Sequence, residues 1–556
     1  MEERRLLLAV ALSLVVLTAY SLLFAPTQPP AAHPSPSPTA VTSEAPQPRP
    51  SSSAPAERPP QPTSPAVADA RERRVEVQAP DYTVAFTNRG ARPVSWTLAR
   101  YRDSRGAPEE MIPAQGASVR PLDVETGDPA VDARLHEALY VPSAEALAVA
   151  VAGPEPQTLR FAWSDGDLAA EKTLSFRATG LVAVSVSVTR NGQPLAARLL
   201  WGPGVGNASP EERDVRGYEE PSAVALARRG VEIFTAAKLP PSGQTLDGVR
   251  WVGLKSHYFA ALFVAPSGAA GAAVRSVTLT AAGDEKPVVA AVAAIDAGGV
   301  EPVQLFVGAK DYPTMAKLGH DLEQVVQVGD WIGPIVVALM RLLRWVQGRV
   351  GNWGWSIVLL TVLINLAMAP FRHYGIVNGL KMAKLSPEMK AIQERYRKVP
   401  LMDPKRQQMQ EEVAALYARH GMSMGSQMLV GCLPLLLTMP FLFAFYRVLA
   451  VSIELRGAPF LWIPDLAQKD PLYLTPVLMG LSMFVMQKMS PSTLDPAQQR
   501  IMMLMPVMLG AMFYAAPAGL NLYWLTANLW SILQQGVSMR LLHPAGARSG
   551  RDKRAK

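Results

Sequence analysis

Apolar residues recur with different spacings along this chain, and each spacing predicts a different kind of structure. Residues 6–25 form an unbroken apolar run. From about 71 to 316 the spacing is two, as in the alternating valines of 182–188, which is typical of half-buried strands. After 331 the apolar runs become long again. The pattern predicts a polytopic α-helical membrane protein with a large β-sandwich domain at 71–316.

Five apolar segments in the C-terminal part approach the length needed to cross a membrane. The predicted spans are 353–371, 428–450, 472–487, 501–516 and 520–537. Two of them, 472–487 and 501–516, have only 16 residues each. A helix of that length reaches about 24 Å, whereas the hydrocarbon core of a bilayer measures roughly 30 Å. We therefore expect a helix bundle that thins the bilayer around it.

The first apolar run, 6–25, has 20 residues and stops at Pro26. A cleaved signal peptide is the alternative, but its apolar region usually covers about 7–15 residues and ends at a small-x-small site. The length favours an uncleaved membrane anchor at 1–25. Residues 26–70 contain 14 prolines and are predicted to be a Pro-rich linker.

Residues 331–350 have the pattern of an amphipathic helix that lies in the membrane interface. Its apolar stripe consists of Ile335, Leu339, Leu342, Leu343 and Val346. Arg341 and Arg344 are on the opposite side, and Trp353 and Trp355 mark an aromatic belt at the start of the next span.

Lysine and arginine are distributed unevenly over the loops, which predicts the orientation of the spans. Segment 372–419 carries ten, segment 451–471 carries two, and the tail after 539 carries six. The positive-inside rule then places the N-terminus, the loop 372–427 and the tail 538–556 in the cytoplasm. Together with the anchor, this predicts six transmembrane helices with the β domain outside.

The loop 372–427 is predicted to be a basic helical hairpin. Apolar residues recur at spacings of three and four on both sides of a break at 400–404, where Asp403 is a good N-cap. The basic residues of the proposed docking face are Lys381, Lys384, Lys390, Arg395, Arg397 and Lys398. Two interpretations are open: a solvated hairpin, or a docking surface for ribosomal RNA, anionic lipid or nascent chain.

Polar side chains form a stripe on each of two predicted spans. The two stripes consist of Thr361, Asn365 and Arg372 in the second span and Asn521, Asn528 and Gln535 in the last. Polar groups in hydrocarbon are costly, so they face protein or water. Hydrogen bonds between helices account for single residues of this kind. Two aligned stripes instead favour a hydrated groove.

Methionines are frequent in the last spans, where 471–540 contains ten. Ordinary packing or lipid contact explains most such residues. Flexible thioethers also adapt to varied apolar partners, which suits a surface over which many different helices slide. The residues assigned to this hydrophobic slide are Met479, Met483, Met486, Met505 and Met508.

Composition and motifs argue against several kinds of catalytic site. The single cysteine, Cys432, excludes an internal disulfide and a cysteine-based zinc cluster, and the seven histidines show no H-E-x-x-H spacing. No Gly-Lys dipeptide is present, so the sequence has no P-loop. His420 and Ser423 lie at a predicted cytoplasmic helix end, so an intramembrane protease has no placed nucleophile and base. We expect no catalytic residue, no metal site and no cofactor.

Several strings in the C-terminal part are familiar. They are GNWGWS at 351–356, LSPEM at 385–389, GCLP at 431–434, IELRGAPF at 453–460, QKMSP at 487–491, Met505-Pro506, PAGL at 517–520 and NLWSILQQ at 528–535. In these strings the chain resembles the YidC/Oxa family of membrane protein insertases over about 331–540. WVGLKSHYF at 251–259 and FVGAKDY at 306–312 resemble the Gram-negative form of the family, which carries a large periplasmic domain.

The resemblance implies an inner membrane protein with a five-helix insertase core and a periplasmic β-supersandwich. It implies a chaperone that inserts newly made membrane proteins, alone or with the Sec translocase, and that works with the ribosome and the lipid bilayer. The implied groove is hydrophilic and open to cytoplasm and lipid. A polytopic solute transporter or channel is the alternative, but it would show paired interrupted segments in repeated halves, and none is visible.

One position departs from the family pattern. The groove of the family usually carries an arginine in the second span, and the corresponding residue here is Asn365. Arg447 in the third span is one candidate for the missing charge, but its depth favours a side chain that extends to the outer interface. Arg372, on the Asn365 stripe, is the better substitute. No role is assigned to the β domain, and the basic tail is either solvated or in contact with the ribosome.

Overall fold

The computed structural model describes twelve stretches of the chain. They are 65–113, 119–144, 148–150, 155–177, 180–279, 288–299, 301–329, 331–396, 399–400, 403–420, 439–489 and 496–542. The predicted anchor 1–25, most of the linker 26–70 and the tail beyond 542 lie outside the described residues. The chain divides into two compact units, one with 61–376 and 434–556 and the other with 377–433 and 1–60, and each is described by itself.

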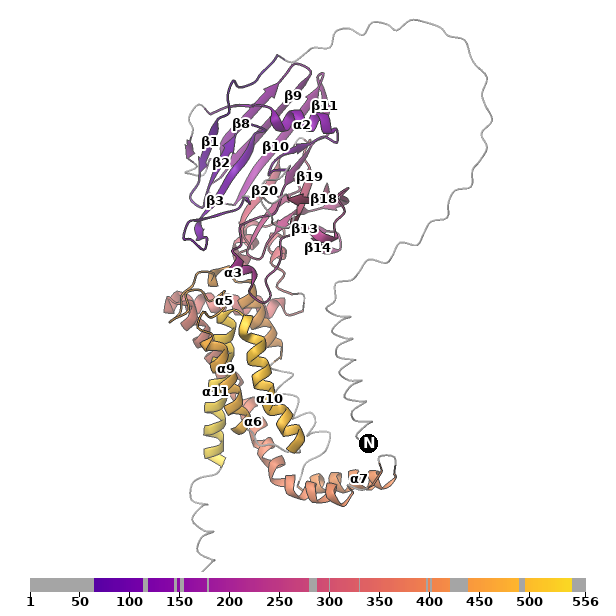
Figure 1. The fold of residues 1–556 in the computed structure, drawn as a ribbon, viewed down its shortest axis with the longest axis vertical. Coiled ribbons are helices and arrows are strands. Elements are labelled where there is room, and N and C mark those ends of the chain that lie inside the picture. The colour runs from indigo at the N-terminus through magenta and orange to yellow at the C-terminus, as the bar shows by residue number, and fades with distance from the viewer. Residues whose placement is uncertain are drawn as a thin grey trace, which may run out of the picture. The chain divides into compact units, whose positions relative to one another are not determined.

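The larger unit begins with a β domain whose described strands form three sheets (Figure 1). A five-stranded sheet has the order β4-β3-β2-β1-β7, with β1 (Arg74–Gln78), β2 (Tyr82–Thr87), β3 (Arg92–Arg102), β4 (Pro108–Glu110) and β7 (Ala148–Ala150). Another five-stranded sheet has the order β15-β18-β19-β12-β5, with β5 (Val124–Glu125), β12 (Arg198–Trp201), β15 (Gln244–Val249), β18 (Ala270–Leu279) and β19 (Val288–Asp296).

The largest sheet has ten strands in the order β14-β13-β16-β17-β20-β10-β9-β8-β6, with β11 paired to β10. Its strands are β6 (Val141–Pro142), β8 (Gln157–Ser164), β9 (Leu168–Phe176), β10 (Leu181–Arg190), β11 (Gln193–Leu195), β13 (Ser222–Ala227), β14 (Gly230–Thr235), β16 (Trp251–Lys255), β17 (Phe259–Val264) and β20 (Val303–Ala309). Its described neighbours pair antiparallel, for example β10 with β9 and β20.

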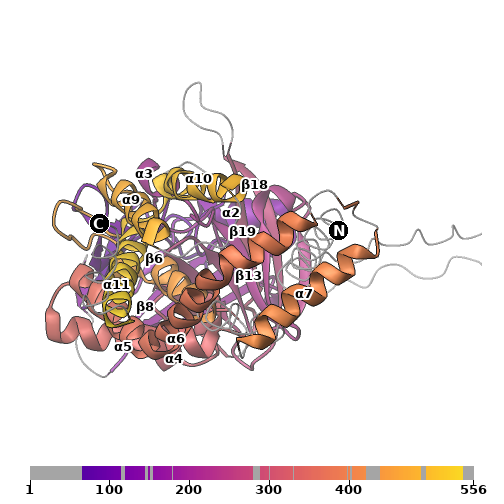
Figure 2. The ribbon, with the colours of Figure 1, turned by 90° about the horizontal axis from the view of Figure 1, so that it is seen from below.

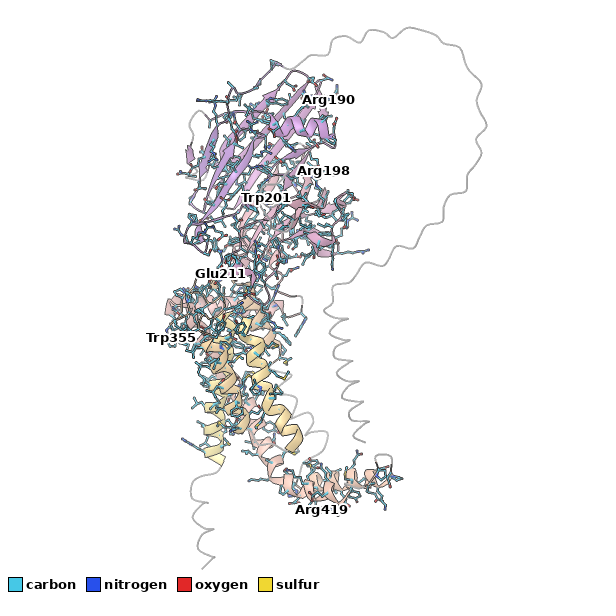
Figure 3. The ribbon with its side chains drawn as sticks, viewed as in Figure 1. Arg190, Arg198, Trp201, Glu211, Trp355 and Arg419 are labelled. Carbon is cyan, nitrogen blue, oxygen red and sulfur yellow. The ribbon has the colours of Figure 1, made fainter. Side chains whose placement is uncertain are left out.

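These strands show the alternation of buried and exposed residues that the sequence predicts. The alternating valines of β10 are buried while the residues between them are half-buried or exposed. Asn191 and Gly192, both with positive φ, close the turn to β11. Trp96 and Trp201 meet edge to face in the core of the β domain, with ring centroids 6.0 Å apart. Trp201 is labelled in Figure 3. The predicted β-sandwich is confirmed, and it is a large one.

Short helical elements lie between the strands or follow the last one, β20. They are α2 (Pro129–Glu137), α3 (Pro210–Arg213), η1 (Ala236–Lys238), α4 (Tyr312–Leu318) and η2 (Leu322–Val326). Asp128 caps α2, Ser209 and Glu212 form a capping box around α3, and Asp311 caps α4.

The helical part of the larger unit follows the β domain in the sequence. Its described helices are α5 (Gly333–Val350), α6 (Trp353–Arg395), Met439–Val451, η3 (Ile453–Leu455), α9 (Leu474–Met489), α10 (Pro496–Met512), η4 (Phe513–Ala515) and α11 (Ala518–Leu542). By length and composition, α6 is the one described helix that could cross a membrane. The apolar helices Leu474–Met489 and Met502–Ala515 are shorter than the same test requires. Of the predicted span 428–450, residues 428–438 lie outside the described residues, and the described part is the apolar helix Met439–Val451.

Two helices differ from what their sequences suggest. The helix α6 runs without interruption through the predicted boundary at 371, although Pro370 lies inside it, because one missing hydrogen bond bends a helix more readily than it ends it. In α5 the buried stripe contains Val336 and Met340, whereas the predicted Leu342 is 38% exposed. The helix is therefore rotated relative to the expected stripe, and Arg344 lies near protein carboxylates instead of solvent.

The smaller unit contains a helical hairpin made of the C-terminal part of α6 and α7 (Lys405–Arg419), which run side by side in Figure 2. Leu385 packs against Tyr417, and Ile392 packs with Met409 and Leu416. The Asp403 carboxylate accepts a hydrogen bond from the Lys405 amide at the start of α7. The apolar seam agrees with the residues that the sequence predicts.

Candidate functional site

The polar stripe on α6 lies inside the helix bundle. Thr361 is fully buried and Asn365 is 5% exposed. The Thr361 hydroxyl donates to the Ile357 carbonyl at 2.7 Å, and the Asn365 amide donates to the Thr361 carbonyl at 2.8 Å. Both side chains thus satisfy donors within their own helix, which makes them tolerable in an apolar environment.

The polar stripe on α11 contacts α9. Asn528, 9% exposed, donates to the Ser482 hydroxyl at 3.0 Å, and Ser482 donates in turn to the Met479 carbonyl at 2.7 Å. Asn521 is fully buried and donates to the Phe513 carbonyl at 3.2 Å. Gln535 is also buried. The stripe therefore lies on a face of α11 that is covered by protein.

Long polar side chains connect α6 with α11. Arg372 Nη1 donates to the Ser531 hydroxyl at 2.6 Å, and Gln534 Nε2 donates to the Ala369 carbonyl at 2.7 Å. At the next residue of α6, His373 Nδ1 lies 2.9 Å from the Ser538 hydroxyl of α11. These bonds bring Arg372 to the stripe of α11, one turn from Asn528.

Sequence analysis did not identify several of these partners. Ser531 and Ser538 share the spacing of Asn528 and Gln535, so a search of the stripe for hydroxyls as well as amides would have found them. Ser482 carries no such signal, because a single serine in an apolar run predicts no partner.

Arg372 has no carboxylate within ion-pair distance among the described residues. Among the described residues, Gln534 Oε1 on α11 and Gln487 Oε1 on α9 are buried without a hydrogen-bond partner. Buried polar atoms of this kind are costly unless a partner arrives.

The end of the bundle nearer the β domain has a different character. Ile357 and Leu360 of α6 pack in one buried apolar cluster with Leu520 of α11 and Phe445 of the helix Met439–Val451. Phe445 stacks on Tyr523 with ring centroids 4.3 Å apart. This end therefore contains an apolar cluster together with the buried polar side chains of Thr361 and Asn521. The described hydrogen bonds between α6 and α11 lie farther along α6, at Ala369, Arg372 and His373.

The proposed slide residues are not equivalent. Met479 is fully buried, whereas Met505 and Met508 on α10 are 43% and 64% exposed. Met483 and Met486 lie between these extremes. The helices α9 and α10 pack against each other at Gly480 and Gly510, where a Cβ on Gly480 would make an ordinary van der Waals contact at 3.4 Å with the Pro506 carbonyl oxygen. The exposed methionines of α10 are therefore the accessible part of this surface.

The basic residues of the hairpin face outward where they are described. Lys381, Lys384, Lys390 and Arg395 are exposed, and Arg395 forms an ion pair with Glu412 at 2.9 Å. Arg397 and Lys398 lie outside the described residues.

Arg447 does not contribute to the polar stripe. Its guanidinium donates to the Gln327 carbonyl at 2.6 and 2.9 Å and lies 3.6 Å from a carboxylate oxygen of Glu219, both outside the membrane helices. The prediction that this side chain extends toward the outer side agrees with these contacts.

Glu219 is the centre of a charged group in the β domain. Lys255 and Lys310 lie 3.2 and 3.3 Å from its carboxylate. Burial raises the pKa of Glu219, but Lys310, Lys255 and Arg447 outweigh this effect and hold it at about 2. Burial, reinforced by Lys310, lowers the pKa of His257 to about 4. Burial lowers the pKa of Lys310 to about 8. These shifts describe a buried ion cluster.

Metal chemistry has no support in the described residues, where no group of three or more His, Cys, Asp or Glu side chains is placed to hold an ion. The polar stripe contains amides, hydroxyls and one cation.

Most of the chain matches two described protein families. Residues 74–342 match the family described as "YidC periplasmic domain", and residues 345–545 match the family described as "60Kd inner membrane protein". Proteins called "Membrane protein insertase YidC" from Geobacter metallireducens and Geobacter sulfurreducens are each 32% identical, and the alignments cover 98% of this chain and 100% of theirs.

A solved structure, "Active YidC insertase crystal structure with the first transmembrane domain resolved", is 16% identical and has a TM-score of 0.34. The match covers 86% of this chain and 94% of that one. The identity over the whole length of the two Geobacter proteins is decisive: this chain belongs to the family of YidC membrane protein insertases, inner membrane proteins with a periplasmic domain.

Proposed function

We propose that this protein inserts newly made membrane proteins into the inner membrane and helps them fold. One observation carries the proposal beyond family membership: the described hydrogen bonds between α6 and α11 lie at the end of these helices away from the β domain, where Arg372 and Gln534 reach from one helix to the other. A polar segment of an incoming chain would enter at this end. Its apolar helix would then pass into lipid without nucleotide hydrolysis, because the transfer of about 20 apolar residues into the bilayer is itself favourable.

The groove is proposed to use the two polar stripes. Thr361, Asn365 and Arg372 would line one wall, and Asn521, Asn528 and Gln535 the other. Gln534 and Gln487 add acceptor oxygens that are buried without a partner in the described structure. These neutral groups shelter backbone and side-chain donors of many sequences, since they require no particular charge.

Arg372 is proposed to attract acidic segments of the incoming chain. Its described hydrogen bond goes to a serine hydroxyl, which a substrate carboxylate can replace with a stronger, charge-assisted bond. Asn365 lies two turns away on α6 and is uncharged, so the positive charge of the groove is displaced toward the end away from the β domain.

Crosslinking on stalled ribosomes tests the function itself. A photoreactive residue at Asn365 or at Met483 should form adducts with a short nascent membrane protein, whereas the same residue at the exposed position Ile233 of the β domain should not. Absence of adducts at both helix positions, with normal expression, would remove the proposal.

The hairpin is proposed to dock the ribosome through Lys381, Lys384, Lys390 and Arg395, with Arg397 and Lys398 beside them. Replacing the first four by Gln should weaken co-sedimentation with ribosomes, and the binding of the parent should fall steeply with salt. A matched control replaces four exposed β-domain residues, Arg74, Arg105, Arg228 and Arg229. Equal losses in both variants would show only a nonspecific charge effect.

The topology is proposed to have six spans with both termini in the cytoplasm, and insertion is proposed to proceed alone or with the Sec translocase. Insertion into liposomes that contain this protein with and without Sec would separate the two modes. Labelling of cysteines introduced at Ser549 and at Arg198, from either side of the membrane, would test the orientation.

A further inference from the structure

A short segment after the helix Met439–Val451 enters the β domain. Within η3, Ile453 is 2% exposed and packs in the core cluster of the β sandwich. Leu455, two residues later, is 1% exposed and packs in the apolar cluster of the helix bundle. One helical turn therefore inserts side chains into two different cores, which joins the β domain to the helices.

Arg456 continues the connection with buried charges. Its Nε donates to Glu212 at 2.5 Å, and its Nη2 lies 2.8 Å from a carboxylate oxygen of Glu109. Its Nη1 donates to the Arg102 carbonyl at 3.0 Å. The side chains of Arg456, Glu109 and Glu212 are at most 8% exposed. A guanidinium in such surroundings has almost no freedom to change partners without leaving a buried carboxylate unpaired.

Arg447 makes a second connection of the same kind. It contacts Glu219 and the carbonyl of Gln327. Gln327 has a left-handed backbone with φ 53°, which a non-glycine residue adopts only where the surroundings favour it. Its side-chain oxygen accepts from Lys255 at 3.0 Å, so this residue receives both a β-domain cation and a helix cation.

The signs of the charges are complementary over the whole contact. Cations of the helical part meet carboxylates of the β domain in four places. The pairs are Arg344 with Asp311, Arg447 with Glu219, Arg456 with Glu109 and Glu212, and Lys469 with Asp214. Arg456 and Lys469 are the two basic residues of the segment 451–471, on the side where the positive-inside rule disfavours them. Pairing with the β domain gives both a structural reason.

We propose that Arg447 and Ile453–Arg456 form a latch whose partner is the β domain of the same chain, and that the β domain thereby positions the outer end of the helix Met439–Val451. The β domain is then a support for the membrane helices and more than a separate periplasmic module. The proposal depends on contacts inside the chain and stands whether or not the groove works as described above.

A disulfide reporter in the full-length protein tests the latch. The Arg216 amide donates to the Ala515 carbonyl at 2.8 Å, so cysteines at these two positions report contact between the β domain and the helices. The reporter protein carries Cys432→Ser together with Arg216→Cys and Ala515→Cys. The rate at which its disulfide forms is compared with the rates after adding Arg456→Gln, Glu109→Gln or the control Arg198→Gln. The control residue Arg198, which is labelled in Figure 3, pairs with Asp296 on the surface of the β domain.

The latch predicts that Arg456→Gln slows disulfide formation by about fivefold or more and that Glu109→Gln, which leaves Glu212 as a partner, slows it less. The control should oxidise at the parent rate. A parent rate in Arg456→Gln would overturn the proposal. If Arg456→Gln does not fold, Glu109→Gln and Ile453→Ala decide instead, and parent rates in both would equally overturn it.

Discussion

Two polar regions of the helical part use charge in opposite ways. At the latch, Arg447 and Arg456 meet carboxylates of the β domain, and Arg456 has two. In the stripe between α6 and α11, Arg372 bonds to a serine hydroxyl, and no described carboxylate lies within ion-pair distance. The first arrangement neutralises charge inside the molecule. In the second, the described partner of the cation is a neutral hydroxyl.

The difference teaches how to separate structural from functional polar residues in a membrane protein. A buried cation with buried carboxylates is already compensated, so its removal damages the fold. A partly buried cation bonded to a neutral group contributes less to the fold and is available to a ligand. Burial also separates the two arginines, because the Arg456 side chain is 8% exposed whereas Arg372 is half-buried.

The largest expected effect tests this distinction through stability. Arg456→Gln leaves Glu109 and Glu212 buried without their cation and should lower the free energy of unfolding by about 3 kcal/mol or more. Arg372→Gln should cost about 1 kcal/mol or less, because only a bond to a hydroxyl is lost. Denaturation of both full-length proteins in the same detergent measures the difference. Equal losses would contradict the comparison.

Acid should weaken the latch before it affects the stripe. The pKa of His257 falls from 6.5 to about 4 on folding, so the unfolded chain binds more protons between these values. Stability contributed by neutral His257 is therefore present above pH 6.5 and is lost as the pH falls toward 4. The pKa of Glu219 is held at about 2, below its ordinary value of 4.5, so further stability is lost as the pH falls below 4.5. The lowered pKa of His257 alone changes the free energy of unfolding by at most about 3 kcal/mol over this pH range.

Unfolding midpoints measured from pH 7 to pH 4 check this prediction. His257→Gln should flatten the dependence between pH 6.5 and 4, whereas His320→Gln, at an exposed position, should retain it. An unchanged slope in His257→Gln would exclude that residue as the source.

Arg372 should matter for substrates more than for stability. Arg372→Ala should lower insertion of an acidic-tailed substrate roughly tenfold relative to a neutral-tailed one, since a charge-assisted bond contributes about 1.5–3 kcal/mol. Arg447→Ala should reduce both substrates alike, because its contacts lie in the latch. Asn365→Arg in the Arg372→Ala protein should restore part of the difference. If the ratio of acidic-tailed to neutral-tailed insertion is the same in Arg372→Ala and Arg447→Ala, Arg372 does not attract acidic segments.

The smallest effect concerns the exposed methionines. Met508 is 64% exposed, so Met508→Leu should change stability by less than about 0.5 kcal/mol. If thioether flexibility matters, leucine at Met505 and Met508 together should narrow the range of inserted substrates in a competition assay. Insertion profiles identical to the parent would leave lipid contact as the role of these residues.

Several elements follow directly from local sequence. The alternating valines of β10 indicate a half-buried strand, and the spaced apolar residues of the hairpin indicate the seam that forms between Leu385 and Tyr417. The stripe on α6 is also visible, because Thr361, Asn365 and Arg372 share a helical face. The partners are not visible: Ser482 and Ala369 are ordinary members of apolar runs, and only packing brings them to Asn528 and Gln534.

The sequence by itself determined the membrane character, the β domain, the basic hairpin and the membership of an insertase family, because these depend on periodicity, charge distribution and extended strings of residues. It did not determine which charges are compensated. Arg456 and Arg372 look alike as arginines beside apolar runs, yet one meets Glu109 and Glu212 and the other meets Ser531. Those carboxylates are more than 200 residues away in the chain, so only the tertiary structure decided that one arginine holds the protein together and the other faces the proposed groove.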